Sequence, residues 1–474
     1  MTEQPAVRRR DVGLRSERGP VLLAVMLSTA LVALDQTIVS TAVPSIVRDL
    51  GGFRQFPWLF SVYLLAQAAT VPVYGRLADQ FGRKPLMYYG IGMFLLGSVL
   101  CGLAWSMPVL IVARGLQGLG AGAVQPIGMT IIGDLYTLRE RAKVQGYVAS
   151  VWGVSSVVGP TFGGVFSQLL SWRFIFWVNV PLCLLAALML RRFTERVDRG
   201  RVNVDYAGAV LLTLATTLVV LGLLEGGGSW PWRSWQTAAV FGSAAVLLVG
   251  FALVERVVEQ PILPLRVFAS RTLRVTSAIS MLVGGLILGL SSYVPTLGQD
   301  VIGASAIVSG FALAALTLGW PVSASLSGRL YLSSGFRATG LLGVLLAVLG
   351  SLVLVLLDPT TSLWPVAAGC LLIGFGMGWV AAPALVVAQS SVAWGERGVA
   401  TATNMFSRSV GSAVGVAVFG AMVNAAAGDS PSPAALATGV HRVFVGILVL
   451  ALAMGALELL MPRRVSPPRV APPG

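Results

Sequence analysis

One acidic side chain lies far inside an apolar stretch of this 474-residue chain. Of the 19 acidic residues, only Asp35 falls well within a long apolar run. Where such a run crosses a membrane, a charge at its centre costs about 2.5–3.5 kcal/mol on insertion scales, so these residues usually face a polar cavity and have a function. Desolvation favours the protonated form of a carboxyl group, which suits a group that takes up and releases protons. Asp35 is therefore the leading candidate for a proton carrier; the alternative is a polar contact between helices.

Two basic side chains, Arg114 and Arg408, also lie inside apolar runs. Arg114 is a permanent positive charge, and it would lower the proton affinity of a nearby acid when the two approach. The alternative for Arg114 is a structural ion pair or hydrogen bonds to carbonyls at a helix end. Three roles are open for Arg408, which has Asn404 one turn before it: holding an anionic substrate group, balancing the charge of Asp35, or bonding carbonyl groups.

Further polar and amphipathic side chains inside apolar runs are candidates for lining a substrate cavity. They are Gln67, Gln117, Gln125, Trp152, Trp379, Gln389, Asn404 and Arg408. Each of them also suits a hydrogen bond between two packed helices. His441 is the only histidine, and all three cysteines fall inside apolar runs, so we expect neither a metal site nor a disulfide framework.

The composition requires a membrane to position these residues. Hydrophobic residues make up 56% of the chain and charged residues only 11%, whereas a soluble domain carries roughly 25% charged residues. Apolar runs near the length of a membrane-spanning helix recur from end to end. An all-α polytopic membrane protein is expected, and a soluble enzyme, a secreted disulfide scaffold and a disordered regulator are excluded. The net charge of +14 is spread over short loops, so no nucleic-acid-binding module is expected.

Apolar windows between charged or turn-rich breaks predict fourteen transmembrane helices. Their approximate limits are 20–43, 57–74, 86–105, 109–133, 144–168, 174–190, 206–224, 236–254, 273–295, 304–326, 338–357, 363–388, 399–424 and 440–461. The expected organisation is an arm at 1–19, a six-helix bundle at 20–192, two inserted helices with flanking loops at 193–272, a second six-helix bundle at 273–461 and a disordered tail at 462–474.

The distribution of basic residues predicts the orientation of these helices. With both termini in the cytoplasm, 26 of the 33 Lys and Arg residues fall in cytoplasmic segments and five in outer loops. This asymmetry is the usual signature of the cytoplasmic side. The loops are short and contain no Walker-type phosphate loop, which argues against a chain that hydrolyses ATP by itself.

An internal repeat relates two of the short loops. The segments 75–85 and 328–337 both begin Gly-Arg-Leu, and the second lies 253 residues after the first. In this register Gly82 matches Gly335, while Leu332 replaces Asp79. The offset corresponds to about eight spans with their loops, as in two parallel six-helix halves separated by two extra helices.

The first copy of this repeat and one later helix are predicted to control conformation. We expect a conformational latch formed by Gly75, Asp79, Gly82, Arg83, Lys84 and Asp134. Its glycines allow a tight turn, and Asp79 would cap a helix or pair with an arginine in one transport state only. A second group of small residues is expected to break and thin the helix at 144–168, making it pliable. That group is Gly159, Pro160, Gly163 and Gly164.

Four stretches together resemble the major facilitator superfamily. The loop 75–85 is similar to the family signature between helices 2 and 3, and 34–44 (LDQTIVSTAVP) is similar to the helix-1 signature of its fourteen-helix drug:proton antiporters. Residues 114–122 (RGLQGLGAG) resemble the basic motif of helix 4, and 159–164 (GPTFGG) the antiporter motif of helix 5. The resemblance extends over nearly the whole chain. One departure is Ser155, where the helix-5 motif usually has another glycine.

The resemblance implies a proton-coupled exporter of drugs or other amphipathic small molecules, working by alternating access of two bundles. We then expect protons as the coupling ion, no other cofactor, no enzymatic activity, and a monomer in the lipid bilayer of a bacterial cytoplasmic membrane. The alternatives are export of a native metabolite, siderophore or lipid, and a membrane sensor that transports nothing. The presence of Arg408 argues against a strict specificity for dications and leaves neutral and anionic substrates open.

Overall fold

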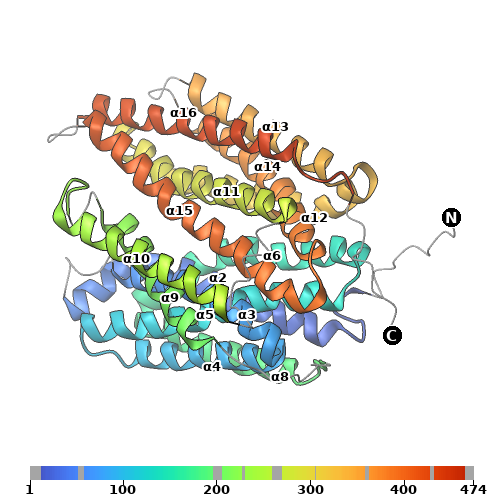
Figure 1. Ribbon diagram of the computed structural model, residues 1–474. Coiled ribbons are helices and arrows are strands. Elements are labelled where there is room, and N and C mark those ends of the chain that lie inside the picture. The colour runs from blue at the N-terminus through green and yellow to red at the C-terminus, as the bar shows by residue number, and fades with distance from the viewer. Residues whose placement is uncertain are drawn as a thin grey trace. The chain divides into compact units, whose positions relative to one another are not determined.

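The computed structural model describes residues 12–51, 58–195, 205–226, 230–258, 270–304, 306–357, 362–427 and 432–464. Within these ranges every regular secondary-structure element is a helix (Figure 1). The one strand-like feature there is an isolated β-bridge between Gly226 and Trp230. Most of the predicted arm and tail, at 1–11 and 465–474, lies outside the described residues. The chain divides into two compact units, and each is described separately below.

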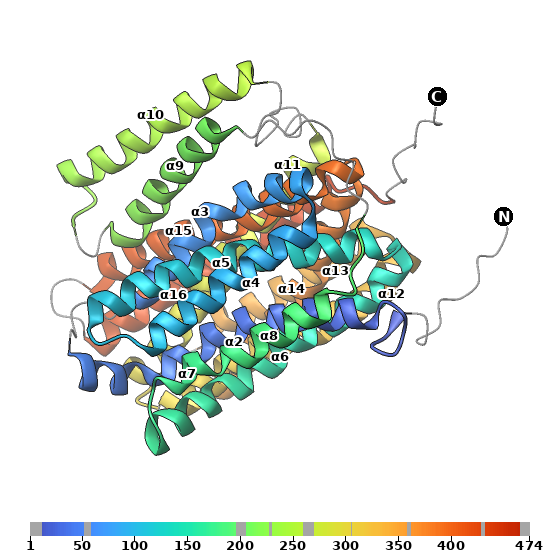
Figure 2. The same ribbon diagram turned by 90° about the horizontal axis from the view of Figure 1, so that it is seen from below.

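Unit 1 comprises Met1–Ala209, Val258–Leu263 and Trp394–Ala402. Its helices are α2 (Gly19–Leu50), α3 (Trp58–Phe81), α4 (Arg83–Gly102), α5 (Met107–Leu135), α6 (Leu138–Leu169), α7 (Phe174–Trp177) and α8 (Asn179–Leu190). Helix α2 packs against α6 and α8, and α5 packs against α3 and α4 (Figure 2). This packing brings the polar side chains of four or more helices into one interior.

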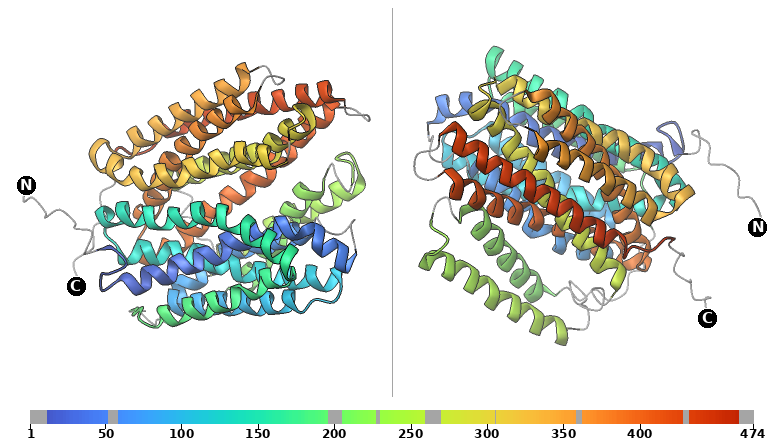
Figure 3. Two further views of the ribbon diagram at one scale, coloured as in Figure 1. Left: turned by 180° about the vertical axis from the view of Figure 1, so that it is seen from behind. Right: turned by 90° about the horizontal axis from the view of Figure 1, so that it is seen from above.

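Unit 2 comprises Val210–Val257, Pro264–Ala393 and Thr403–Gly474. Its helices are α9 (Tyr206–Glu225), α10 (Trp235–Val257), α11 (Arg271–Thr296), the π-helix η2 (Leu297–Val301), α12 (Ala306–Ser334), α13 (Phe336–Leu356), α14 (Leu363–Ser390), α15 (Arg397–Ala427) and α16 (Pro433–Glu458). Helix α14 packs against α12 and α13, and α16 packs against α11 and α13 (yellow to red in Figure 3). The short helix η3 (Trp394–Glu396) and the start of α15 belong to unit 1.

Helices α9 and α10 form a hairpin and lie side by side (Figure 2). Their facing surfaces meet at Gly222, where an added Cβ would lie 2.9 Å from the ring of Phe241. Only 11% of the most apolar window of α10 is buried, and Val246 and Val249 are largely exposed. So much exposed apolar surface is suited to contact with lipid rather than water.

Twelve of the described helices are long and apolar enough to cross a membrane. The prediction of fourteen spans is not supported by this measure. The predicted helix at 144–168 corresponds to α6, which is 32 residues long but carries charged and hydroxyl side chains that lower its hydropathy. The predicted helix at 174–190 corresponds to α7 and α8, an apolar segment that is shorter than the other spans.

The two copies of the loop repeat share an unusual backbone conformation. Gly82 has φ 96° and ψ 154°, and Gly335 has φ 88° and ψ 162°. Each residue immediately precedes a helix, α4 or α13. Because residues with a Cβ rarely adopt positive φ, glycine is needed at both turns. The same turn therefore starts α4 in unit 1 and α13 in unit 2.

Candidate functional site

The carboxylate of Asp35 on α2 is buried against the guanidinium of Arg114 on α5. Arg114 Nη1 donates to Asp35 Oδ2 at 2.5 Å, and the two side chains are 1% and 0% exposed. Arg114 Nε donates to the carbonyl of Leu59 at 3.1 Å, and its Cζ lies 4.2 Å from the ring centroid of Tyr63. Three helices therefore converge on one buried ion pair, in which each charge has a partner.

Gln117 extends the pair into a polar network, which we name the Asp35 network. Its Nε2 donates to Asp35 Oδ1 at 2.8 Å and to Ser98 Oγ at 2.9 Å, and its Oε1 accepts from Arg114 Nη1 at 2.6 Å. Asn179 Nδ2 donates to the same Ser98 Oγ at 3.2 Å. Gln117 is completely buried, so it belongs to this network instead of lining an open cavity. Both oxygens of Asp35 accept a hydrogen bond.

Three members of the Asp35 network were not predicted: Tyr63, Ser98 and Asn179. Ser98 is the only serine or threonine in the apolar run 86–105, and this isolation was a usable signal. Asn179 begins α8, beside the break from α7. The role of Tyr63 as a ring under a guanidinium has no signature along the sequence, because Arg114 lies 51 positions away.

A glycine on α4 allows the close approach that places Gln117. A Cβ added to Gly97 would lie 2.5 Å from the backbone nitrogen of Gln117, whereas one added to Gly92 on the same helix would meet nothing within 4 Å. We expect Gly97→Ala to destabilise the protein by about 1–3 kcal/mol through overpacking. Gly92→Ala should be neutral or slightly stabilising, since alanine favours helices more than glycine does. Thermal unfolding of the two variants in detergent measures the difference, and equal midpoints would contradict it.

A second charged group, the Arg83 cluster, is formed by Asp79, Arg83, Asp134 and Arg397. The side chain of Arg83 is fully buried, and its Nη2 lies 2.8 Å from Asp79 Oδ1. Its Nε lies 3.0 Å from Asp134 Oδ2, in an ion pair whose angle does not make a hydrogen bond. Arg397 Nη1 lies 3.1 Å from Asp134 Oδ1. Two arginines and two acids thus form one chain of contacts, which includes the three charged residues predicted for the latch other than Lys84.

The Arg83 cluster holds the start of α15. Asp79 accepts hydrogen bonds from the backbone nitrogens of Gly398 at 3.1 Å and Val399 at 3.0 Å. A carboxylate at this position satisfies free N–H groups of the first helical turn and complements the helix dipole. Arg83 Nη2 also donates to the carbonyl of Trp394 at 3.1 Å, and its guanidinium lies over the Trp394 ring at 4.1 Å. Neither Trp394 nor Arg397 was predicted as a partner.

Glu195 caps the neighbouring helix α4. Its carboxylate accepts from the backbone nitrogens of Arg83 at 2.8 Å and Lys84 at 3.1 Å. Lys84 Nζ donates to the carbonyls of Arg191 at 2.9 Å and Phe193 at 2.6 Å. Lys84 therefore anchors the segment after α8, whereas its neighbour Arg83 contacts the acids of the cluster. Glu195 was missed because it lies more than a hundred residues from the loop that it caps.

At the C-terminal end of α2, Asp49 forms a more exposed ion pair with Arg173. Asp49 Oδ2 accepts from Arg173 Nη1 at 2.7 Å and from Trp172 Nε1 at 3.0 Å. The hydrogen bond from Arg173 holds the pKa of Asp49 below its usual range. The Asp49 side chain is 48% exposed, so the bridge is screened by solvent and contributes little to stability.

The predicted break in the helix at 144–168 is wrong. Helix α6 runs without interruption through Gly159, Pro160, Gly163 and Gly164. A proline removes one N–H donor, but a membrane helix tolerates this where neighbouring groups satisfy the freed carbonyl. The small-residue contact does exist, because a Cβ on Gly159 would overlap Thr37 Oγ1 of α2. Thr37 Oγ1 also donates to the Ser155 carbonyl at 3.1 Å. The side chains of Pro160 and Gly164 lie outside the described residues.

The predicted cavity residues of unit 1 lie on three helices. Gln67 on α3 donates through Nε2 to Gln125 Oε1 on α5 at 3.0 Å. This bond is the helix-to-helix contact that the sequence left open as an alternative. Trp152 on α6 is partly exposed.

The predicted cavity residues of unit 2 have different environments. Asn404 Nδ2 donates to the Thr276 carbonyl of α11 at 3.2 Å. Trp379 on α14 has a buried indole nitrogen without a hydrogen-bond acceptor among the described residues. Gln389, further along α14, is 3% exposed. Arg408 on α15 is partly exposed.

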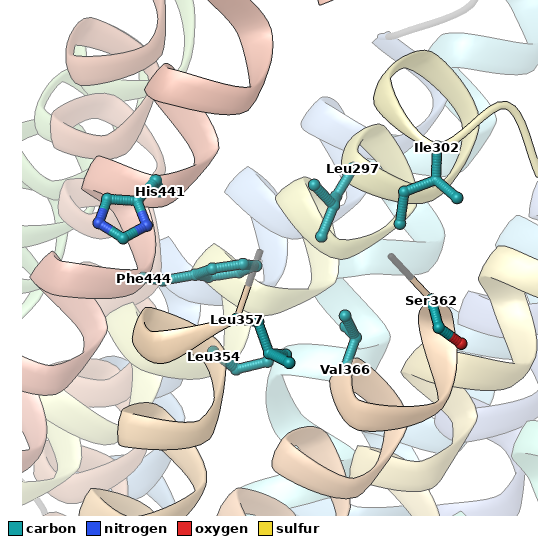
Figure 4. A pocket seen from close by; sticks show the side chains of 8 residues that line it. All are labelled: Leu297, Ile302, Leu354, Leu357, Ser362, Val366, His441 and Phe444. Atoms are coloured by element: carbon teal, nitrogen blue, oxygen red, sulfur yellow. The ribbon is translucent and has the colours of Figure 1, made fainter. Parts of the chain in front are cut away.

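A small pocket in unit 2 has none of these residues in its lining (Figure 4). It is lined by Leu297, Ile302, Leu354, Leu357, Ser362, Val366, His441 and Phe444. Its volume is about 10 Å³, enough for about one water molecule. Sites for drug-sized ligands usually occupy about 300–1,000 Å³, so this pocket is not a substrate site.

The described residues also show the state of the cysteines. Cys101, Cys183 and Cys370 are all buried free thiols. Cys101 Sγ lies 3.9 Å from Gln117 Oε1, beside the Asp35 network. Within the described ranges, no group of three or more His, Cys, Asp or Glu side chains is placed to hold a metal ion.

Comparison with known proteins identifies the family of the chain. The family model described as Major Facilitator Superfamily matches residues 25–416. The chain is 35% identical over 418 residues to the Multidrug transporter protein MdtP of Bacillus subtilis (strain 168), covering 88% of this chain and 77% of that protein. It is 34% identical over 401 residues to the Multidrug resistance protein 3 of the same organism, covering 84% and 78%. It is 32% identical over 418 residues to the MFS-type efflux pump LUC4 of Fusarium sp, covering 85% and 73%.

A solved structure shares the fold. The crystal structure of the human organic anion transporter MFSD10 (TETRAN) aligns with a TM-score of 0.65 at 16% identity, over 93% of this chain and 99% of that one. At this identity the likeness concerns the fold alone. The family model and the relatives above both span most of the chain. The chain is therefore a multi-pass membrane transporter, not an enzyme, and belongs to the major facilitator superfamily.

Proposed function

We propose that the protein is a proton-coupled antiporter that exports drugs or other amphipathic small molecules across the cytoplasmic membrane. One observation carries this proposal: a completely buried carboxylate, Asp35, whose cationic partner Arg114 is also buried within the membrane-spanning part of unit 1. An ionisable pair in this position is costly and usually marks an ion or proton pathway. Protons are then the coupling ion, and the protein works as a monomer.

The network offers a physical means of coupling. As a carboxylate, Asp35 accepts from Arg114 and Gln117. A proton arriving on Asp35 would cancel its charge and weaken its hold on Arg114, so that α2 and α5 are free to move apart. Loss of the proton on the opposite side of the membrane would restore the pair. Protonation and helix position are thereby linked, as alternating access requires.

The Arg83 cluster is proposed to be the latch of one transport state. It joins α3, α5 and the start of α15 through the ion pairs of Asp79 and Asp134 with Arg83 and Arg397. Helix α15 continues past Ala402 into unit 2, so the chain itself connects this cluster to the second unit. Opening the cluster would release the first turn of α15.

Resemblance supports the finer assignment to the fourteen-helix drug:proton antiporters. We propose that α6 and the segment α7–α8 also cross the membrane, which completes fourteen spans with both termini in the cytoplasm. Twenty-six of the 33 basic residues then face the cytoplasm, in accord with the positive-inside rule. Relatives named as multidrug transporters and efflux pumps support the drug substrate class.

The energy available is adequate for export. One proton driven by 100 mV supplies about 2.3 kcal/mol, which sustains roughly a fiftyfold gradient of a neutral substrate. Export of a native metabolite, siderophore or lipid by the same mechanism is the alternative, and a substrate panel decides between them. A sensor without transport activity is disfavoured by membership of a transporter family.

The test is uphill transport in proteoliposomes under an imposed pH gradient, comparing wild type with Asp35→Asn. We expect wild type to accumulate a probe from a panel of lipophilic cations, neutral dyes and anionic antibiotics. Asp35→Asn should retain exchange of the same probe without a gradient but lose uphill accumulation, since it cannot carry the proton. Retained exchange also shows that the variant is folded.

The matched control is Asp49→Asn, which removes an exposed carboxylate from the same helix. It should accumulate the probe as wild type does. Uphill accumulation by Asp35→Asn equal to that of wild type would move the coupling site elsewhere.

A further inference from the structure

Arg408 is a cation at the middle of a membrane-spanning segment. The candidate span Trp394–Val423 places it near the centre, with about 20 Å of helix on either side. Among the described residues, no side chain or carbonyl group forms a hydrogen bond or ion pair with its guanidinium. Arg114 differs in this respect, since it has both a carboxylate and a carbonyl as partners. Arg408 is thus a permanent charge without a described counter-ion.

The backbone of Arg408 is fixed even though its side chain has no described partner. A Cβ on Gly284 of α11 would overlap the Arg408 carbonyl oxygen, and a Cβ on Gly411 would overlap the carbonyl of Met281. One turn before Arg408, Asn404 is tied to the Thr276 carbonyl of α11. The two helices are therefore in close contact before, at and after Arg408, and this contact presents the guanidinium from a rigid support.

The two helices in contact at Arg408, α11 and α15, carry hydroxyl groups and no acid. Neither α11 nor α15 has an Asp or Glu anywhere in its sequence. The hydroxyl groups of Ser277 on α11 and Thr403 on α15 are buried and have no hydrogen-bond partner among the described residues. A site built to bind a cation would need an acid, which neither helix supplies, whereas these two hydroxyl groups can donate to an anion.

Two of the three roles that the sequence left open for Arg408 are removed by the geometry. Arg408 is not needed to balance the charge of Asp35, because both Asp35 oxygens already accept hydrogen bonds from Arg114 and Gln117. Carbonyl groups at helix ends are out of reach from mid-span, and no described carbonyl accepts from Arg408. A lipid headgroup is equally remote, since arginines reach the interface only from near a helix end.

We propose that Arg408 binds the anionic group of an amphipathic substrate, so that the exporter accepts organic anions. This inference rests on the proposed export function and names the substrate class of that function. The guanidinium presents a planar fork of donors that matches carboxylate and sulfonate oxygens, and charge-assisted bonds of this kind are about twice as strong as neutral ones. Substrate binding then supplies the counter-ion that the described residues lack.

The experiment uses two probes with one carbon skeleton. 8-Anilinonaphthalene-1-sulfonate carries a permanent negative charge, and N-phenyl-1-naphthylamine is the same molecule without the sulfonate. The full-length protein is reconstituted in proteoliposomes, and uphill transport of each probe is measured under a pH gradient. The variants are Arg408→Gln and Arg408→Lys, with Arg442→Gln as the control, because Arg442 is an exposed arginine of the same unit.

We expect wild type and Arg442→Gln to transport both probes. In Arg408→Gln, uphill transport of the sulfonate probe should fall roughly tenfold or more, which is equivalent to about 1.4 kcal/mol. Transport of the neutral probe should stay within about twofold of wild type. Arg408→Lys should fall between them, since it keeps the charge but not the fork. Retained transport of the neutral probe shows that the variants are folded. An equal loss of both probes in Arg408→Gln and Arg408→Lys would overturn the inference and give Arg408 a structural role.

Failure of the inference and failure of the proposed function give different results. If wild type exports the neutral probe uphill but never the sulfonate, the export function stands and the anion site is refuted. If neither probe moves uphill, binding of the sulfonate to the purified protein in detergent is decisive. Binding that is lost in Arg408→Gln but kept in Arg442→Gln supports the anion site and refutes proton-driven export of these probes. Binding that is unchanged in Arg408→Gln refutes the site.

Discussion

Arg114→Met is expected to lower the free energy of unfolding by about 3–5 kcal/mol, because it leaves Asp35 as a buried carboxylate without its cation. The methionine approximates the aliphatic part of the arginine side chain, so little of the loss comes from packing. Gln117 would still donate to Asp35 Oδ1, but one hydrogen bond from an uncharged donor does not replace an ion pair at 2.5 Å.

The measurement is a double-mutant cycle of thermal or denaturant unfolding in detergent. Asp35→Asn, Arg114→Met and the double variant are compared with wild type. The double variant should be more stable than Arg114→Met alone, because an asparagine in the network needs no cation. The contrary result is additivity, in which Asp35→Asn lowers the free energy of unfolding by the same amount in Arg114→Met as in wild type. The two side chains would then not be energetically coupled, and the pair would have no stabilising role.

Most helix positions could be predicted from apolar windows, and the deviations have identifiable causes. The expected helix at 109–133 is α5 (Met107–Leu135), and that at 338–357 is α13 (Phe336–Leu356). The helix expected to end at 43 continues as α2 to Leu50. Its last turn carries Arg48 and Asp49, which end the hydrophobic pattern without ending the helix, and Asp49 is held by Arg173. Hydropathy alone cannot register such a polar extension.

The individual charged residues of the candidate site were predictable, but their partners were not. Asp35 and Arg114 are noticeable because each is an isolated charge in an apolar run. Their contact joins positions 79 residues apart, and no periodicity encodes it. The cap that Asp79 provides to Val399 spans 320 residues. Ordinary capping signals lie within one turn of the helix that they start, so a cap from another helix has no local signature.

Arg83→Met is the second substitution with a large expected effect. The side chain of Arg83 is fully buried and contacts both Asp79 and Asp134. Without it, Asp79 would lose its ion-pair partner, and Asp134 would lose one partner and keep Arg397. Mutual repulsion and desolvation of these acids should open the cluster, at a cost of about 3–5 kcal/mol to this arrangement. We expect hydrogen exchange in the segment Trp394–Ala402 to accelerate by at least roughly tenfold, as its first-turn contacts with Asp79 and Arg83 are lost.

Lys84→Met is the matched control, because it removes the same charge at the next position. Its Nζ bonds only the carbonyls of Arg191 and Phe193 among its described contacts, so the start of α15 should keep the exchange rate of wild type. Transport separates a latch from a merely structural contact. If opening of the latch is part of the transport cycle, Arg83→Met should change the rate of substrate exchange measured without a pH gradient. It should also show the faster hydrogen exchange. Faster hydrogen exchange with unchanged transport would mean that the cluster stabilises one arrangement of the chain without controlling the transport cycle. Unchanged hydrogen exchange would mean that Asp79 alone holds the start of α15.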